Sequence, residues 1–225
     1  MPALILLYMS HFEIEVKSLL GAKEVAMALK EKMQALDAAT VQTSTNKQLN
    51  HYFHKGDVNE LYKKVEHLFK DEEQAKLKMI IERGNEFSVR TRQKDEEVLL
   101  VVKASIDEGT SANTVKRMEF EEGVEVSLDA LDALVLEAGF EYQAKWSRER
   151  EEYSYKGASV CFDKNAGYGY LVEFEKIVQN ESEADTVREE IDVLMSELGV
   201  EELSQERLAR MFDFYNKNWP DYYGT

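Results

Sequence analysis

Short segments in which apolar and charged residues alternate recur along this 225-residue chain. From Phe12 to Lys17 the apolar residues are even-numbered and the charged residues are odd-numbered. Successive side chains of a β-strand point to opposite faces of a sheet, so this period of two predicts a strand with one apolar and one charged face. A helix would repeat its apolar residues every three to four positions instead. Strand patterns of this kind are more numerous along the chain than helix patterns.

The predicted strands are distributed over the first 178 residues. They are 10–17, 49–54, 77–82, 87–93, 98–104, 115–121, 140–146, 149–155, 158–163 and 169–178. The dipeptide Gly84-Asn85 is typical of a tight hairpin, because both residues tolerate the positive φ of such a turn. It predicts that 77–82 and 87–93 pair as neighbouring strands.

Apolar residues at helical spacing predict helices between these strands and at the C-terminal end. The predicted helices are 21–36, 58–69, a segment capped by Ser127 and stopped at Gly139, 187–198, and 204–215. No repeat or composition break marks a linker, so we expect one domain over residues 1–225. It is an α+β domain around an antiparallel sheet or barrel at about 10–178, with C-terminal helices at about 182–217.

The composition excludes several classes of partner. Lys plus Arg is 28 and Asp plus Glu is 44, which gives a net charge of −16. Nucleic acid polymers and anionic membranes both attract a surplus of positive charge, so we expect neither as a partner. Any anion that binds must meet a local basic cluster. The one cysteine, Cys161, excludes a disulfide framework, and its apolar neighbours predict a buried thiol.

The apolar run Pro2–Met9 is too short to cross a bilayer and lacks the basic start and cleavage site of a signal peptide. We expect it to lead into the first strand, unless Met9 is the true start. No later segment is apolar enough to cross a membrane, so the expected location is the cytoplasm. The sequence leaves open whether the protein is a monomer or a homodimer.

The charges on the predicted strands are sorted by sign. Like charges stand two residues apart, on one face, in the pairs Glu13/Glu15, Arg90/Arg92, Arg148/Arg150 and Glu173/Glu175. Alternating charge is common on an exposed sheet face, but a solvated face would gain from mixed signs. If helices cover the apolar faces, the charged faces converge on an interior. Lys145 competes with Arg148 for the inward position if the register differs.

An interior of this kind suits an anionic ligand that carries a divalent cation. Carboxylates supply the oxygen ligands that Mg²⁺ and Mn²⁺ prefer. Guanidinium and ammonium groups bind phosphate oxygens. Phosphoryl transfer needs mainly positioning and charge stabilisation, which such a set of residues provides.

The order of the charged motifs resembles that of the CYTH superfamily, the triphosphate tunnel metalloenzymes. The matching residues are Glu13-Ile-Glu15-Val-Lys17, Arg90-x-Arg92, Lys103, Arg117-x-Glu119-x-Glu121, Arg148-x-Arg150, Asp163, Gly167-Tyr-Gly169 and Glu173-Phe-Glu175. The match runs from about residue 11 to 176. The resemblance implies an eight-stranded antiparallel β-barrel with flanking helices, which encloses a tunnel and acts on triphosphate-bearing substrates.

The resemblance also implies roles for these residues. Mg²⁺ or Mn²⁺ would be bound by Glu13, Glu15, Asp163, Glu173 and Glu175. The phosphate chain would be held by Lys17, Arg90, Arg92, Lys103, Arg117, Arg148 and Arg150. The catalytic residues would be Lys17, Arg92 and Glu119. The chain departs from the family pattern at Arg148, where relatives often have Lys, at Tyr168, usually Leu, and at His54, where an acid is common.

Three functions stay open at this point. The first is a metal-dependent triphosphatase that acts on inorganic triphosphate or a small organic triphosphate such as thiamine triphosphate. The second is a class IV adenylyl cyclase, and the third a non-catalytic binder of polyphosphate or nucleotide. We rank hydrolysis first, because cyclisation also requires an adenosine pocket that the sequence does not identify.

Two further groups receive no role in the site. His51 and His54 fall on opposite faces of one strand, so they are not expected to share a metal, and we expect both at the surface. The aromatic residues between 212 and 223 are expected to pack the C-terminal helices, with a possible partner surface.

Overall fold

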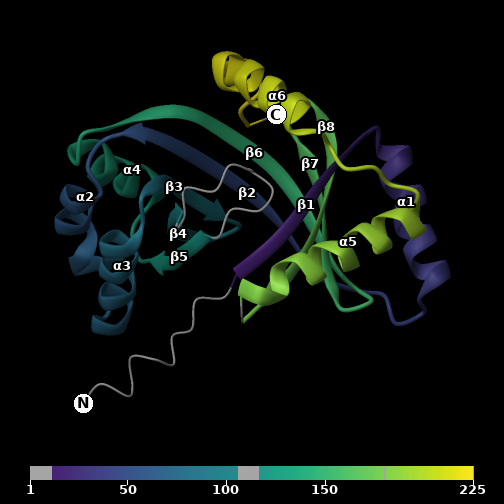
Figure 1. The fold of residues 1–225 in the computed structure, drawn as a ribbon. Helices are drawn as coiled ribbons and strands as arrows, with labels where there is room; N and C mark the ends of the chain where they lie inside the picture. Colours follow the sequence, from purple (N-terminus) through teal and green to yellow (C-terminus); the bar gives the residue numbers. More distant parts are fainter. Residues whose placement is uncertain (1–11, 106–116, 180, 225) are drawn as a thin grey trace.

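The computed structural model describes residues 12–105, 117–179 and 181–224, whose path is drawn in Figure 1. For Phe12, Glu13, Arg117 and Glu181 it describes the backbone but not the side chain. The run Pro2–Met9, the start of the predicted strand 10–17 and the start of the predicted strand 115–121 lie outside the described residues.

Eight strands form one antiparallel sheet in the order β1-β8-β7-β6-β2-β3-β4-β5. Their bounds are β1 Phe12–Gly21, β2 Val41–Lys55, β3 Glu86–Lys94, β4 Glu97–Ser105, β5 Arg117–Val124, β6 Phe140–Tyr155, β7 Ala158–Asn165 and β8 Gly169–Val178. The sheet curls until its edge strands β1 and β5 approach each other. Within the described ranges no backbone ladder joins those two edges. The predicted α+β fold, with an eight-stranded antiparallel sheet around a tunnel, is confirmed.

The helices form separate groups around the sheet (Figure 1). Their bounds are α1 Lys23–Leu36, α2 Val58–Val65, α3 Asp71–Arg83, α4 Leu128–Glu137, α5 Ala184–Leu198 and α6 Gln205–Asn218, with 3-10 turns at Glu66–Leu68, Glu181–Glu183 and Trp219–Asp221. Helices α1 and α5 contact β1 and β8, α3 and α4 contact β3–β5 and β6, and α6 contacts β6. Among the described residues, no helix combines the length and the apolarity that a membrane span requires.

Two distinct apolar cores hold helices α1–α5 on the convex face of the sheet. Val16 and Phe174 pack with Ile191 of α5 in the first core. Val102 and Phe120 pack with Leu131 of α4 in the second. Because the even-numbered residues of β1, β4, β5 and β8 face these cores, their odd-numbered neighbours face the concave side. This is the physical reason for the alternation in the sequence.

A smaller cluster joins helix α6 to the sheet. The ring of Tyr215 stacks on Trp146 of β6, with ring centres 3.6 Å apart. Phe212, Tyr222 and Trp219 pack around this pair. The expectation that the C-terminal aromatic residues pack the last helices is therefore confirmed.

The predicted strand 77–82 was wrong, because these residues form the second half of α3. The first turn of α3 carries the acidic residues Asp71–Glu73, which favour a helix N-terminus. The Glu73 carboxylate accepts the Lys70 backbone N–H at 2.9 Å. Leu77 and Ile80, three residues apart, are then both buried in the second core. The predicted hairpin at Gly84-Asn85 was also wrong, since Gly84 ends this helix by donating its N–H to the Ile80 carbonyl.

The segments 140–146 and 149–155, predicted as two strands, form the single strand β6. Its partner β2 is likewise longer than the predicted 49–54. The two pair along nearly their whole length, from Val41 opposite Ser154 to Lys55 opposite Phe140. Together they form the long arch in Figure 1 that connects the two halves of the sheet.

Candidate functional site

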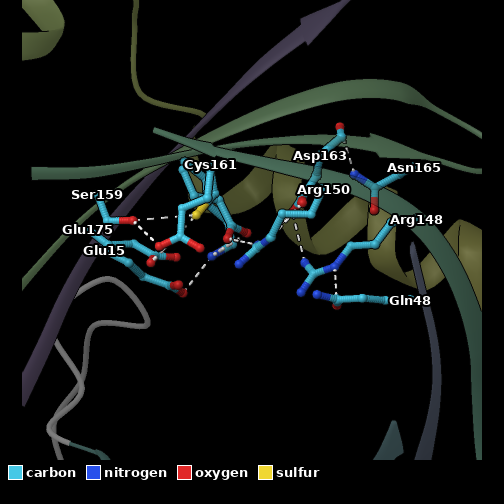
Figure 2. A network of polar contacts seen from close by, with 12 residues as sticks. Glu15, Gln48, Arg148, Arg150, Ser159, Cys161, Asp163, Asn165 and Glu175 are labelled. Carbon is cyan, nitrogen blue, oxygen red and sulfur yellow. Dashed lines mark hydrogen bonds and ion pairs between the residues drawn. The ribbon is translucent and has the colours of Figure 1, made fainter. Parts of the chain in front are cut away.

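Charged and amide side chains line the concave face of the sheet. Figure 2 shows part of this network, with labelled residues from β1, β8, β7, β6 and β2 projecting from the sheet toward one another. Three groups of contacts can be distinguished along it: an acidic cluster on β1 and β8, an arginine pair on β6, and a second basic group on β3 and β4.

The acidic cluster consists of Glu15 of β1 with Glu173 and Glu175 of β8. Their carboxylates offer oxygen atoms that all lie within 4.8 Å of one another. The register of the antiparallel pair explains this, because Glu15 stands opposite Glu175 and Lys17 stands opposite Glu173. Three carboxylates at this spacing are a donor set suited to a hard divalent cation.

Lys17 lies inside the acidic cluster. Its Nζ is 2.5 Å from Glu15 and 3.1 Å from Glu173. Burial would lower the pKa of Lys17, but the charges of Glu173 and Glu15 hold it above its usual value. Burial would likewise raise the pKa of Glu173, yet Lys17, Arg150 and Arg148 hold it well below its usual range. Near neutral pH, Lys17 is therefore an ammonium and Glu173 a carboxylate.

The arginine pair of β6 is organised by Asp163 of β7, which is 1% exposed. Asp163 accepts two hydrogen bonds from Arg150, each 2.7 Å long, and one of 2.8 Å from Arg148. Arg150 also donates to Glu173, which links the pair to the acidic cluster. On its other side, Arg148 donates its Nε–H to Gln48 of β2 at 2.7 Å.

The second basic group comes from β3 and β4. Arg92 donates to Asn50 of β2 and to Glu121 of β5, both at 2.7 Å. The Arg90 guanidinium lies over the Tyr52 ring, 4.4 Å from its centre. On the neighbouring strand, Lys103 pairs with Glu119 at 3.0 Å. Each of these contacts fixes a cation on the concave face.

The two basic groups converge on Tyr52. Burial would raise the pKa of this phenol, but the charges of Arg90, Arg148, Arg92 and Lys103 lower it. These four cations belong to β3, β6 and β4, so the curl of the sheet directs them to one place in the tunnel. Such a local concentration of positive charge, in a chain of net charge −16, is suited to a polyanion.

The structure brings together most of the predicted site residues. Lys17, Glu15, Glu173 and Glu175 form the acidic cluster, and Arg90, Arg92, Lys103, Arg148 and Arg150 form the basic groups. Asp163 lies outside the group of three carboxylates and contacts the arginines instead. Glu13 and Arg117 belong to β1 and β5, and their side chains lie outside the described part of the chain.

The contacts of Lys145 and Arg148 show which of the two faces the tunnel. Arg148 joins Asp163 and Gln48 in the tunnel. Lys145 lies on the other side of the strand, with its Nζ 4.2 Å from the centre of the Tyr142 ring.

Sequence reasoning missed several residues of the concave face. Gln48, Asn50 and Tyr52 alternate with Leu49, His51 and Phe53, so the period-two signal was present, but amide side chains alone do not indicate a phosphate site. Glu121 was noticed in its motif without a role. Cys161 is buried as predicted, but its thiol lies 3.8 Å from the Glu175 carboxylate. Its apolar sequence neighbours point the other way.

Comparisons with known proteins agree with this geometry. The family model of the CYTH domain matches residues 82–209, which is more than half of the chain. No curated protein sequence matches. Among solved structures, the PH1819 protein of Pyrococcus horikoshii is 21% identical, with a TM-score of 0.58, and the alignment covers 89% of this chain and 99% of that one.

Two further solved structures carry functional descriptions of their own. One, from Vibrio parahaemolyticus, is described as a candidate adenylate cyclase, with 14% identity, a TM-score of 0.58, and 88% and 98% of the two chains covered. The other, a candidate adenylyl cyclase from Hippeastrum, is reported to have a dominant triphosphatase activity. It shares 17% identity and a TM-score of 0.52, over 88% and 95% of the two chains. At these identities the similarity concerns the fold.

Proposed function

This chain belongs to the CYTH domain family, and we propose that it is a metal-dependent triphosphatase that hydrolyses inorganic triphosphate or a small organic triphosphate such as thiamine triphosphate. The observation that carries the proposal is the adjacency of two charge clusters in one tunnel. Oxygen atoms of three carboxylates lie within 4.8 Å of one another. Arg150, one of the basic residues, contacts Glu173, one of these three carboxylates, and so joins the two clusters. A metal–triphosphate complex has the complementary pattern of charge.

Glu15, Glu173 and Glu175 would hold the cation, and their oxygen-only donor set favours Mg²⁺ or Mn²⁺. When bound, the cation would neutralise charge on the phosphate oxygens. Lys17 would lie beside it, because its Nζ already contacts two of the three carboxylates. Its ammonium would compensate part of the negative charge of the cluster.

The basic groups would hold the phosphate chain. A guanidinium has five N–H donors, and the contacts with Asn50 and Glu121 use two of those on Arg92. Those contacts fix the plane of the guanidinium before an anion arrives, which reduces the entropy lost on binding. Asp163 would act in the same way on Arg148 and Arg150, which is a different role from the metal ligation that the resemblance implied.

Hydrolysis requires water to attack the terminal phosphorus and to lose a proton. Arg92 would stabilise the charge that develops on the phosphate oxygens, and Lys17 would do so from the side of the acidic cluster. Glu119, held near Lys103 at 3.0 Å, would be the carboxylate that accepts the proton. The bond between the terminal phosphorus and its bridging oxygen would break, so that orthophosphate forms and the bridging oxygen leaves with the rest of the substrate.

The test offers triphosphate, thiamine triphosphate and ATP to the purified protein with Mg²⁺ or Mn²⁺. Orthophosphate, pyrophosphate and cyclic AMP are measured. We expect orthophosphate from at least one triphosphate and none in the presence of a chelator. The variant Glu175→Gln should reduce this release to background, while Glu190→Gln, an exposed residue of α5 paired with Lys176, should act as wild type.

Other outcomes would replace the proposal. Pyrophosphate and cyclic AMP from ATP would identify a cyclase, the description attached to two of the similar structures. Tight binding of triphosphate without any turnover would identify a binding protein. Wild-type turnover by Glu175→Gln would remove the metal assignment.

A further inference from the structure

A buried polar cluster lies on the convex face of the sheet, behind the arginines of the site. Its centre is Asp132 of α4, which is 2% exposed. One carboxylate oxygen lies 2.6 Å from His51 Nδ1 and accepts the Tyr142 hydroxyl at 2.6 Å. The other accepts the Thr91 hydroxyl at 2.5 Å. The carboxylate of one residue of α4 is thus hydrogen-bonded to side chains of three strands, β2, β3 and β6.

The cluster also corrects an expectation about His51. This residue was expected at the surface, but it is 2% exposed. Its position in the strand puts it on the face opposite Asn50 and Tyr52. The sequence did not show that α4 brings the carboxylate of Asp132, 81 residues later, onto that face.

The register places this cluster directly behind two residues that we assign to phosphate binding. His51 stands opposite Thr91 in the β2–β3 pair. The adjoining cross-strand pairs are Asn50 with Arg92 and Tyr52 with Arg90. Because side chains alternate along a strand, these two pairs point into the tunnel while His51 and Thr91 point to α4. The contacts Arg92–Asn50 and Arg90–Tyr52 are therefore formed one residue away from the Asp132 anchor.

The cluster extends to the C-terminal end of the described chain. The Tyr223 hydroxyl lies 2.6 Å from His51 Nε2. The next residue, Gly224, donates its backbone N–H to the Ser147 hydroxyl of β6 at 3.0 Å. Both ring nitrogens of His51 are thereby engaged, and the imidazole is held in one orientation.

We propose that Asp132 is a positioning residue, which acts through the β2–β3 pair to keep the guanidiniums of Arg90 and Arg92 aligned in the tunnel. A buried carboxylate is costly unless several donors satisfy it, and here three do. In Asp132→Asn an NH₂ donor replaces one of the two acceptor oxygens, so at least one of the three donors loses its partner and β2 and β3 can shift relative to α4. The inference rests on the proposed function, because it assigns the aligned arginines to phosphate.

The first test measures the affinity for inorganic tripolyphosphate by calorimetry, without divalent cation. We expect Asp132→Asn to weaken binding about tenfold. In a double-mutant cycle with Arg92→Ala, the loss in the double variant should be less than the sum of the two single losses, because part of the Asp132→Asn effect acts through the guanidinium that Arg92→Ala removes. The control is Glu137→Gln on the same helix, an exposed residue paired with Lys64 at 2.9 Å, which should bind as wild type.

A second readout requires no ligand. The Nε–H resonance of Arg92 reports its hydrogen bond with Asn50, and we expect Asp132→Asn to shift or broaden it. If Asp132→Asn lowers the thermal stability but binds tripolyphosphate as wild type and leaves the Arg92 resonance unchanged, the inference is overturned. Asp132 would then have a purely structural role. Strictly additive losses in the cycle would overturn it too.

If Asp132→Asn does not fold, Thr91→Val removes one of the three hydrogen bonds with little change of shape. It should weaken tripolyphosphate binding several-fold and perturb the same resonance, and wild-type behaviour in both would contradict the inference. If the wild-type protein does not bind tripolyphosphate, that result would instead contradict the proposed function. The Arg92 resonance would still decide whether Asp132 positions that side chain.

Discussion

At the scale of single residues, Arg92 is held on two sides, by Asn50 and by Glu121. If this fixed guanidinium stabilises charge in the transition state, Arg92→Ala should lower kcat by roughly 10²–10³-fold. Steady-state kinetics of phosphate release measures this. Arg210→Ala on α6, which removes a solvent-exposed partner of Glu206, serves as the control. A change confined to KM would make Arg92 a residue of substrate binding alone.

The hydrogen bonds of Asp132 allow a prediction of how the free energy of unfolding depends on pH. Burial would raise the pKa of its carboxyl, but the hydrogen bonds from His51, Thr91 and Tyr142 hold it below its usual value. Since protonation is harder in the folded state, the stabilisation is fully present above the unfolded pKa of about 3.9. It is lost as the pH falls from there through the lower folded pKa.

Urea unfolding of the wild type and of Asp132→Asn across the acid range measures this contribution. We expect the wild-type unfolding free energy to fall more steeply below about pH 4, so that the two curves approach each other. Parallel curves would show that the hydrogen bonds do not favour the charged form.

At the scale of elements, the start of β8 depends on one close approach. Gly169 has φ +82°, and a Cβ added there would lie 2.2 Å from the Gly21 carbonyl oxygen at the end of β1. Gly169→Ala must therefore displace the β1–β8 pair that holds the acidic cluster. We expect a loss of about 2 kcal/mol or more in unfolding free energy.

Gly157, in the turn between β6 and β7, provides the matched control. Its φ is +78°, but apart from its chain neighbours no heavy atom lies within 4 Å of an added Cβ. Gly157→Ala should cost only the strain of a left-handed backbone, about 1 kcal/mol. Equal losses in the two variants, measured by urea unfolding, would show that the contact with Gly21 is unimportant.

Elements with strong local signals were predictable. Ser127 begins α4, and its hydroxyl accepts the Ala130 N–H at 3.2 Å, as its position before an apolar stripe predicted. The prediction for 77–82 failed because its Ile80-Ile81 pair favours a strand locally. The interaction that decides its structure is with residues distant in the sequence. Its buried face packs against β4 and β5, and no local pattern shows that partner.

The candidate site, like the secondary structure, was predictable in part. Sorted charges at period two identified the concave face, and the order of the motifs identified the family. The partners within the site were not predictable, because they depend on which strands are neighbours. Asp163 was expected to bind metal, and only the β6–β7 register places it opposite Arg150. That residues 1–225 form a single domain stays a prediction.

At the scale of the whole molecule, the proposed metal site would couple cation binding to stability. Its three carboxylates belong to β1 and β8, so a cation that binds them also strengthens that strand pair. A ligand at 100 times its Kd stabilises the folded state by about 2.7 kcal/mol. For a chain of this length we expect Mg²⁺ or Mn²⁺ to raise Tm by roughly 5–10 °C.

Thermal unfolding with increasing cation concentration measures this shift, and a chelator should reverse it. Glu175→Gln should reduce the shift strongly, and Glu190→Gln should not. An equal rise of Tm in both variants would place the cation elsewhere on this acidic protein.

The unjoined edges of the sheet have a mechanical consequence. In a barrel closed by hydrogen bonds, the number and stagger of the strands fix the circumference. Here the ladder ends at β1 on one side and at β5 on the other, within the described part of the chain. Among the described residues, the bore can therefore widen along this seam without breaking an inter-strand backbone hydrogen bond.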